Sequence, residues 1–126
     1  MKSIFNAIIG NATQISNEEI RADYPQMFLE DENIEIAFKL VRDKWIFTSK
    51  RLIFVDVQGL TGSKKEFHSI PYKSIYHFSV ESAGTFDMDS EIKIWIAGGN
   101  GPITKQMKKG FDVNALQRVL TYYTCK

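Results

Sequence analysis

The chain has 126 residues, of which 44% are hydrophobic and 25% are charged, and its formal net charge is +1. This composition is ordinary for a soluble globular protein, and a chain of this length can bury its own core as one domain. The balanced charge, without a run of interleaved arginine and aromatic residues, argues against nucleic acid as a partner. The single cysteine, Cys125, excludes an intrachain disulfide and agrees with a reducing cytoplasm.

The charge is unevenly distributed along the chain. Residues 1–33 hold two basic and six acidic side chains, whereas the remainder holds 14 basic and nine acidic ones. Such asymmetry favours docking of one part on another, or on a neighbouring subunit. The apolar run near the N-terminus is too short for a signal peptide, and no run approaches the roughly 18 apolar residues of a membrane-spanning helix. We therefore expect a cytoplasmic protein, either free or peripheral to a membrane.

The acidic third predicts two short helices. The second begins at Ser16, because Ser16 and Glu19 have the spacing of a capping box, and Pro25 closes or kinks it. The apolar stripe of the first helix is expected to pack on the rest of the chain or on a sister subunit. Its insertion into a lipid interface is the alternative, although the helix lacks the basic polar face of such anchors. The stripe of this first helix consists of Met1, Ile4, Phe5, Ile8 and Ile9.

The remainder of the chain predicts seven short strands and a final helix. The apolar runs are rich in Ile, Val, Phe and Trp and are separated by polar or glycine-rich breaks. Asp112 is a good N-cap for the amphipathic C-terminal helix. We therefore predict a helical extension over residues 1–30 and a β domain over residues 31–126. The predicted strands lie near residues 34–40, 45–47, 52–55, 66–70, 75–81, 91–97 and 103–108.

Two of these runs are apolar on both faces. Trp45–Phe47 and Leu52–Val55 do not alternate, although a sheet with one solvated face should alternate. Either the N-terminal helices or another subunit must therefore cover the outer face. If a subunit covers it, the contact residues would be Trp45, Ile46, Ile53 and Val55.

Several short stretches of the sequence resemble the bacterial pleckstrin-homology (PH) domain family, and together they cover most of residues 30–123. The resemblance implies a mostly β, PH-like barrel of two antiparallel sheets capped by a C-terminal helix and preceded by two short helices. It also implies homo-oligomers, often ring-shaped, and neither an enzymatic activity nor a cofactor. The matching pieces include Ala37-Phe38-Lys39, Lys50-Arg51-Leu52, Ile70-Pro71-Tyr72-Lys73-Ser74-Ile75 and Ala83-Gly84-Thr85-Phe86-Asp87.

Members of the wider PH superfamily bind inositol lipids through a basic cluster between the first two strands. Here that loop shrinks to Val41-Arg42-Asp43-Lys44, which has no room for such a cluster. Inositide binding is therefore not carried over to this chain.

Three further patterns suggest chemistry only weakly. Gly59–Lys65 lacks the spacing of a phosphate-binding loop and is predicted to be a turn between strands. His68 and His77 have no further ligand at metal spacing, so we predict no metal site. A patch of Asp87, Asp89 and Glu91 lacks the pattern of a calcium loop and is predicted to be solvated.

The remaining candidate is a basic surface at strand ends and turns. One interpretation is solubility and cross-strand pairing, with Arg51 near Asp56 or Glu81. The other is docking on an anionic membrane or an acidic protein partner. We therefore predict a non-enzymatic, self-assembling scaffold or adaptor, with peripheral docking as the alternative function. The residues of this surface are Lys44, Lys50, Arg51, Lys64 and Lys65.

Overall fold

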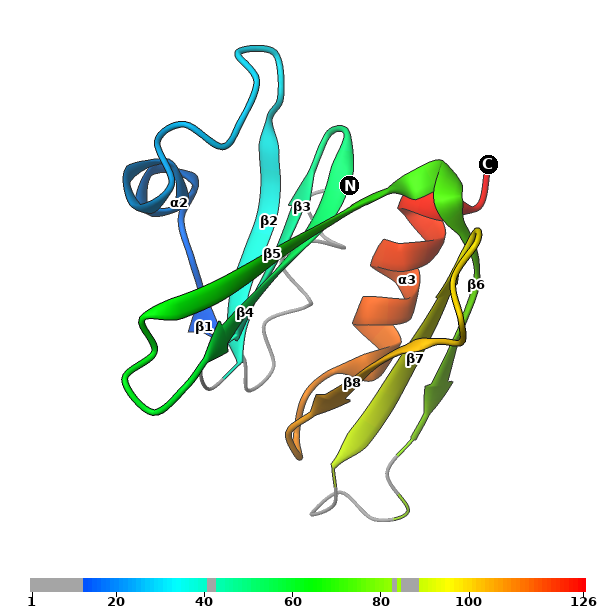
Figure 1. The fold of residues 1–126 in the computed structure, drawn as a ribbon. Helices are drawn as coiled ribbons and strands as arrows, with labels where there is room; N and C mark the ends of the chain where they lie inside the picture. Colours follow the sequence, from blue (N-terminus) through cyan, green and yellow to red (C-terminus); the bar gives the residue numbers. More distant parts are fainter. Residues whose placement is uncertain (1–12, 41–42, 83, 85–88) are drawn as a thin grey trace. The chain divides into compact units, whose positions relative to one another are not determined.

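The computed structural model describes residues 13–40, 43–82, 84 and 89–126 (Figure 1). These residues fall into two compact units, Thr13–Pro71 and Tyr72–Lys126. The first predicted helix, with its stripe from Met1 to Ile9, lies outside the described residues.

The first unit contains one antiparallel sheet whose strands are hydrogen-bonded in chain order, from β1 to β5. The central pairings place Trp45 opposite Phe54 and Ile46 opposite Ile53. β5 pairs with β4 along its whole length and lies at the edge of the sheet. The elements are β1 Thr13–Gln14, α2 Asn17–Asp23, β2 Ile34–Leu40, β3 Asp43–Thr48, β4 Arg51–Gln58 and β5 Lys64–Pro71.

Both faces of the central strands are buried, as their two-sided apolar pattern predicts. On one face, Ile46, Ile53 and Val55 form a core cluster with Ile20 of α2. On the other face, Trp45 packs against three phenylalanine rings. The centroid distances from Trp45 are 5.5 Å to Phe38, 6.2 Å to Phe47 and 4.6 Å to Phe54.

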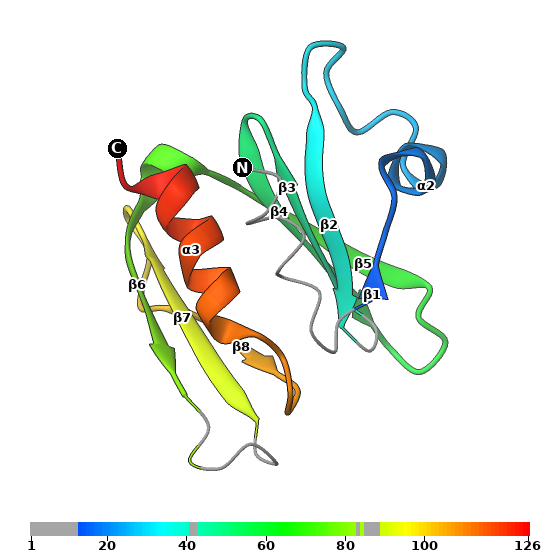
Figure 2. The same cartoon turned by 180° about the vertical axis from the view of Figure 1, so that it is seen from behind.

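Helix α2 begins and ends where the sequence predicts. The Ser16 side chain accepts a hydrogen bond from the Glu19 N–H at 3.1 Å, and Pro25 follows the C-cap residue Tyr24. Seven residues are too few for a helix that is stable by itself. The stability of α2 therefore comes from packing Ile20 on the sheet, beside β2 (Figure 2).

The second unit contains a three-stranded antiparallel sheet in the order β6-β7-β8 and the C-terminal helix α3. Ile92 and Ile94 of β7 are fully buried. The Asp112 side chain accepts a hydrogen bond from the Ala115 N–H at 3.0 Å, which confirms the predicted N-cap. The elements are the 3₁₀ turn η1 Tyr72–Ser74, β6 Ile75–Glu81, β7 Ser90–Ile96, β8 Ile103–Met107 and α3 Val113–Thr124.

The structure confirms the mostly β fold with two antiparallel sheets and a C-terminal helix, and it corrects the prediction of a seven-stranded barrel. Each predicted strand is present, and the two-residue β1 is an addition. Among the described residues, the strands are hydrogen-bonded into one sheet of five strands and another of three, so they do not form a closed barrel. The chain leaves the first sheet at Pro71, which has no N–H to donate, and η1 follows at once.

Two predictions concern the organisation of the chain: a domain boundary after residue 30 and the absence of a membrane-spanning helix. The boundary between residues 1–30 and 31–126 stays a prediction, and residues 13–71, on both sides of it, form one unit. In the described part of the chain, no helix has both the length and the apolar character needed to cross a bilayer.

Candidate functional site

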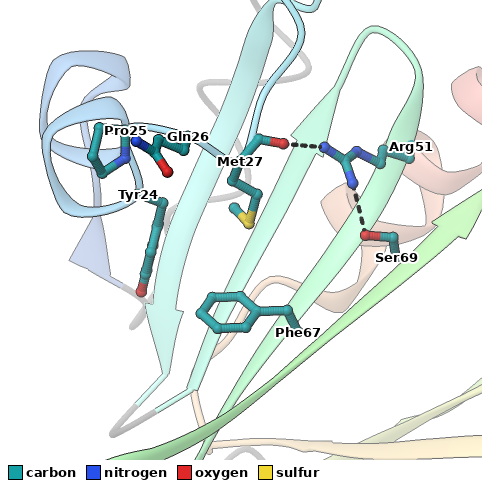
Figure 3. Close-up of a pocket in the computed structure, with 7 residues that line it drawn as sticks. All are labelled: Tyr24, Pro25, Gln26, Met27, Arg51, Phe67 and Ser69. Atoms are coloured by element: carbon teal, nitrogen blue, oxygen red, sulfur yellow. Dashed lines mark hydrogen bonds between the residues drawn. The ribbon is translucent and has the colours of Figure 1, made fainter.

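A pocket of about 510 Å³ lies in the first unit, between the segment that follows α2 and the edge strand β5. Tyr24 and Phe67 meet edge to face across it, with ring centroids 5.4 Å apart. Figure 3 shows Met27 between the aromatic end of the pocket and the polar end formed by Arg51 and Ser69. We call this pocket the α2–β5 groove; it is lined by Tyr24, Pro25, Gln26, Met27, Arg51, Phe67 and Ser69.

Arg51 is the first residue of β4 and joins the two walls of the groove. Its guanidinium donates to the Met27 carbonyl at 2.8 Å and to the Ser69 hydroxyl at 2.9 Å (Figure 3). It also makes a two-pronged ion pair with the Glu32 carboxylate, at 2.8 and 3.2 Å. Since a forked pair of this kind is specific in geometry, Arg51 holds the segment after α2 against the sheet.

Glu32 is the centre of this network and is only 1% exposed. Its carboxylate accepts hydrogen bonds from the Thr48 hydroxyl at 2.7 Å and from the Leu29 N–H at 3.2 Å. Its own carbonyl accepts from Arg21 at 2.6 Å. Burial raises the pKa of Glu32, but the hydrogen bonds from Arg51, Thr48 and Leu29 outweigh burial and hold the pKa below its ordinary value. Glu32 is therefore a buried, ionised anchor.

Lys44, near the start of β3, contacts the residues at the end of α2. Its ammonium donates to the Tyr24 hydroxyl at 3.0 Å and pairs with Asp23 at 3.4 Å. Burial lowers the pKa of Lys44, but these two partners outweigh burial and raise the pKa above its ordinary value. Tyr24 is thus fixed from both sides, by Lys44 and by the ring of Phe67.

The five basic residues predicted as one anionic-binding surface do not lie together. Arg51 and Lys44 have the partners given above, and Lys50 pairs with Asp31 at 3.4 Å. Lys64 and Lys65 begin β5 opposite Gln58 and Val57, at the far end of β4 from Arg51. Both lysines are exposed, and neither has a partner among the ion pairs of the described residues. Lys64 and Lys65 therefore lie together at one end of the β4–β5 pair, and Lys50, which is also exposed, lies at the other end.

The loop between β4 and β5 carries a fully exposed leucine. Leu60 has 104% of its reference accessible area. The loop closes with a hydrogen bond from the Gly62 N–H to the Gly59 carbonyl at 3.4 Å. A strand follows the loop rather than a helix, so the interpretation as a connection between strands is confirmed for residues 59–63, whereas Lys64 and Lys65 already belong to β5.

The residues predicted as oligomer contacts offer no surface to a second copy. Trp45, Ile46, Ile53 and Val55 are all buried within the chain. Ile46, Ile53 and Val55 lie beneath α2. Of the two covers that the sequence allowed, the N-terminal helices or another subunit, a helix of this chain covers this face. Any contact between copies would use other residues.

The candidate metal and acidic residues have ordinary surroundings. His68 and His77 contact aromatic rings, at centroid distances of 6.3 and 4.4 Å. Asp89 accepts a hydrogen bond from a backbone N–H at 3.1 Å, Glu91 pairs with a lysine at 3.7 Å, and Asp87 lies outside the described residues. Within the described ranges, no three His, Cys, Asp or Glu side chains gather into a group that could hold a metal ion.

Sequence reasoning missed Tyr24 and Phe67, which line the groove, and Glu32, which holds Arg51 beside it. Glu32 stands in the run Glu30-Asp31-Glu32, and nothing in that run distinguishes the buried carboxylate from the exposed ones. Tyr24 carries no signal in the sequence beyond its place before Pro25. Phe67 gave the one available signal, as a lone aromatic side chain among the charged and polar residues of Lys64–Ser69.

Two antiparallel sheets followed by a C-terminal helix define the class of PH-like proteins, and solved structures agree. The chain superposes on a pleckstrin homology domain from Shewanella amazonensis with a TM-score of 0.82 and 45% identity, covering 96% of this chain and 98% of that one. A DUF1696 family protein with a PH domain from Shewanella loihica gives a TM-score of 0.80 and 43% identity, with 91% and 98% covered.

The profile of the bacterial PH domain family matches residues 3–124, so the chain belongs to this family, and the resemblance is confirmed. The uncharacterized protein YjqA of Bacillus subtilis is 53% identical over 116 residues, which cover 91% of this chain and 93% of YjqA. Nothing in these matches indicates an enzymatic activity.

Proposed function

We propose that the protein is a non-catalytic, self-assembling PH-like scaffold or adaptor, and that the α2–β5 groove is one side of the contact between copies. The observation that carries this proposal is Phe67, which is 46% exposed on an edge strand beside an apolar groove. An exposed apolar side chain on a strand edge favours association unless a partner covers it. The resemblance to the family, which implies homo-oligomers, favours a second copy as that partner.

Charge complementarity also supports a second copy. The exposed start of α2 carries Glu18 and Glu19, and the exposed start of β5 carries Lys64 and Lys65. An acidic surface of one copy can therefore meet the basic end of β5 in the next copy. Such a head-to-tail contact uses two different surfaces, and it closes into a ring when the rotation between copies permits.

Light scattering coupled to size-exclusion chromatography tests this function at micromolar concentration. We expect a defined multimer for the wild type and a monomer for Phe67→Glu, because a buried, unpaired carboxylate opposes the contact. Tyr76→Glu is the matched control, since Tyr76 is 73% exposed on β6, and it should remain assembled. A monomeric wild type would overturn self-assembly. An assembled, folded Phe67→Glu variant would overturn the groove as the contact.

A second candidate function is docking on an anionic surface through the basic turn at the start of β5. It is favoured by Lys64 and Lys65, which are adjacent, exposed members of the predicted basic surface. Both a lipid surface and an acidic protein partner fit this charge. The test is binding that falls steeply with salt and is lost in Lys64→Glu/Lys65→Glu, because exposed charges are screened. The cytoplasmic location remains part of the proposal.

A further inference from the structure

The most exposed large apolar side chain among the described residues is Leu60, at 104% of its reference area. It lies between Gly59 and Gly62, whose φ angles are +79° and +71°. Only glycine adopts such angles without strain, so the sharp turn that presents Leu60 depends on these two glycines. No side-chain atom would hinder a Cβ at Gly59, so the surroundings of the loop are open solvent.

The two charged residues that follow Leu60 along the chain are basic. Lys64 and Lys65 follow the loop, whereas the carboxylates Asp56 and Glu66 lie opposite each other one position deeper in the β4–β5 pair. The residues from Val57 to Lys65 contain no acidic side chain. A surface that approaches the loop tip therefore meets an apolar side chain first. Behind it lie the two lysines and the carboxylate of Asp43, which accepts a hydrogen bond from the Val57 N–H at 3.0 Å.

We propose that the β4–β5 loop docks on an anionic lipid bilayer, with Leu60 inserted among the acyl chains and Lys64 and Lys65 at the lipid head groups. This inference rests on the second candidate function and chooses lipid over an acidic protein. An anionic bilayer offers both features at once, an anionic layer for the lysines and an apolar phase beneath it for the leucine.

The strength of this docking depends on the number of copies. One leucine and two lysines hold a protein on a bilayer no better than one myristoyl chain, which by itself binds only marginally. On one assembly, the loops whose lysines do not contact the acidic surface of a neighbouring copy would act together and raise the apparent affinity. A test of insertion should therefore not depend on the affinity of a single loop.

Insertion can be measured on protein that is tethered to the vesicle. A C-terminal histidine tag would hold the full chain on phosphatidylcholine vesicles that contain a nickel-chelating lipid. The vesicles would be prepared with and without about 30% phosphatidylserine, which gives a strongly anionic surface. The environment-sensitive dye NBD would be attached at Leu60→Cys in a Cys125→Ser background. Leu29→Cys is the control, because Leu29 is 59% exposed in another turn of the same unit.

We expect a blue shift and quenching by spin-labelled lipid for the dye at position 60, stronger with phosphatidylserine, and neither for the dye at position 29. No blue shift at position 60 on either vesicle would overturn insertion, whether or not the protein self-assembles. Equal shifts at both positions would also overturn it, because the response would then come from tethering alone.

Untethered protein provides the second measurement. Co-sedimentation with phosphatidylserine vesicles should fall at least tenfold in Leu60→Asp and in Lys64→Glu/Lys65→Glu. A tenfold fall corresponds to a loss of about 1.4 kcal/mol of binding free energy. Lys108→Glu/Lys109→Glu is the matched control for charge and should bind like the wild type, since this adjacent pair is also exposed. Loss of binding in the lysine variant but not in Leu60→Asp would keep electrostatic docking and overturn insertion. Light scattering on the same samples reports self-assembly separately.

Discussion

The two ends of β4 carry similar basic residues in different settings. At its start, Arg51 is engaged by Glu32, Met27 and Ser69. Opposite its end, Lys64 and Lys65 are exposed. The difference comes from Glu32, which the segment after α2 brings to one end of the strand only. A cation near a buried carboxylate stabilises the fold, whereas a cation without one remains available to a partner.

The largest effect on stability is expected at the Arg51 end of β4. Glu32→Ala should lower the free energy of unfolding by about 3–5 kcal/mol, because it leaves the Arg51 guanidinium without its buried partner. Urea denaturation followed by tryptophan fluorescence measures this loss. Lys64→Ala is the control at the other end and should change the free energy by less than about 0.5 kcal/mol. A loss below about 1 kcal/mol for Glu32→Ala would contradict the role of Glu32 as an anchor.

Arg51→Lys should cost about 2 kcal/mol, although the charge is conserved. An ammonium cannot reproduce the forked pair with Glu32 while it also reaches Met27 and Ser69. Lys50→Arg, at the neighbouring exposed position, is the matched control and should be neutral. If both variants are neutral in urea denaturation, the charge alone accounts for the contribution of Arg51.

The pH dependence of stability sharpens the same comparison. The pKa of Glu32 is lowered in the folded protein from its ordinary value of 4.5. The contribution of Glu32 is therefore fully present above about pH 4.5 and is lost as the pH falls through the lower folded pKa. Thermal melts between about pH 7 and 3 should fall more steeply for the wild type than for Glu32→Gln. Parallel profiles would show that Glu32 titrates alike in the folded and unfolded chains.

The smallest effect on stability is expected at the exposed end. Lys64→Glu/Lys65→Glu should change the free energy of unfolding by no more than about 0.5 kcal/mol, since neither lysine is part of the core or of the Glu32 network. Lys44→Met should cost more, about 1 kcal/mol, because Lys44 bonds Tyr24 and Asp23. Equal effects of the two changes in urea denaturation would remove the distinction between engaged and exposed cations.

Sequence reasoning predicted the strands, the caps at Ser16 and Asp112, and the need for a cover over the outer face of β3 and β4. These features depend on neighbours within a few residues, so their signals are local. The partners of the basic residues were not predictable in this way. Arg51 and Glu32 are 19 positions apart, and the sequence suggested Asp56 or Glu81 as the partner of Arg51.

The sequence by itself determined which segments are strands and helices, because apolar periodicity, capping residues and turn glycines act over short distances. The PH-like architecture followed from the resemblance of its short stretches to a known family. Only the tertiary structure decided that α2 covers Ile46, Ile53 and Val55, and that Glu32 engages Arg51 while Lys64 and Lys65 stay exposed. The physical reason is burial: a carboxylate anchors a cation strongly only where the fold removes both from water, and burial is a property of the packed chain.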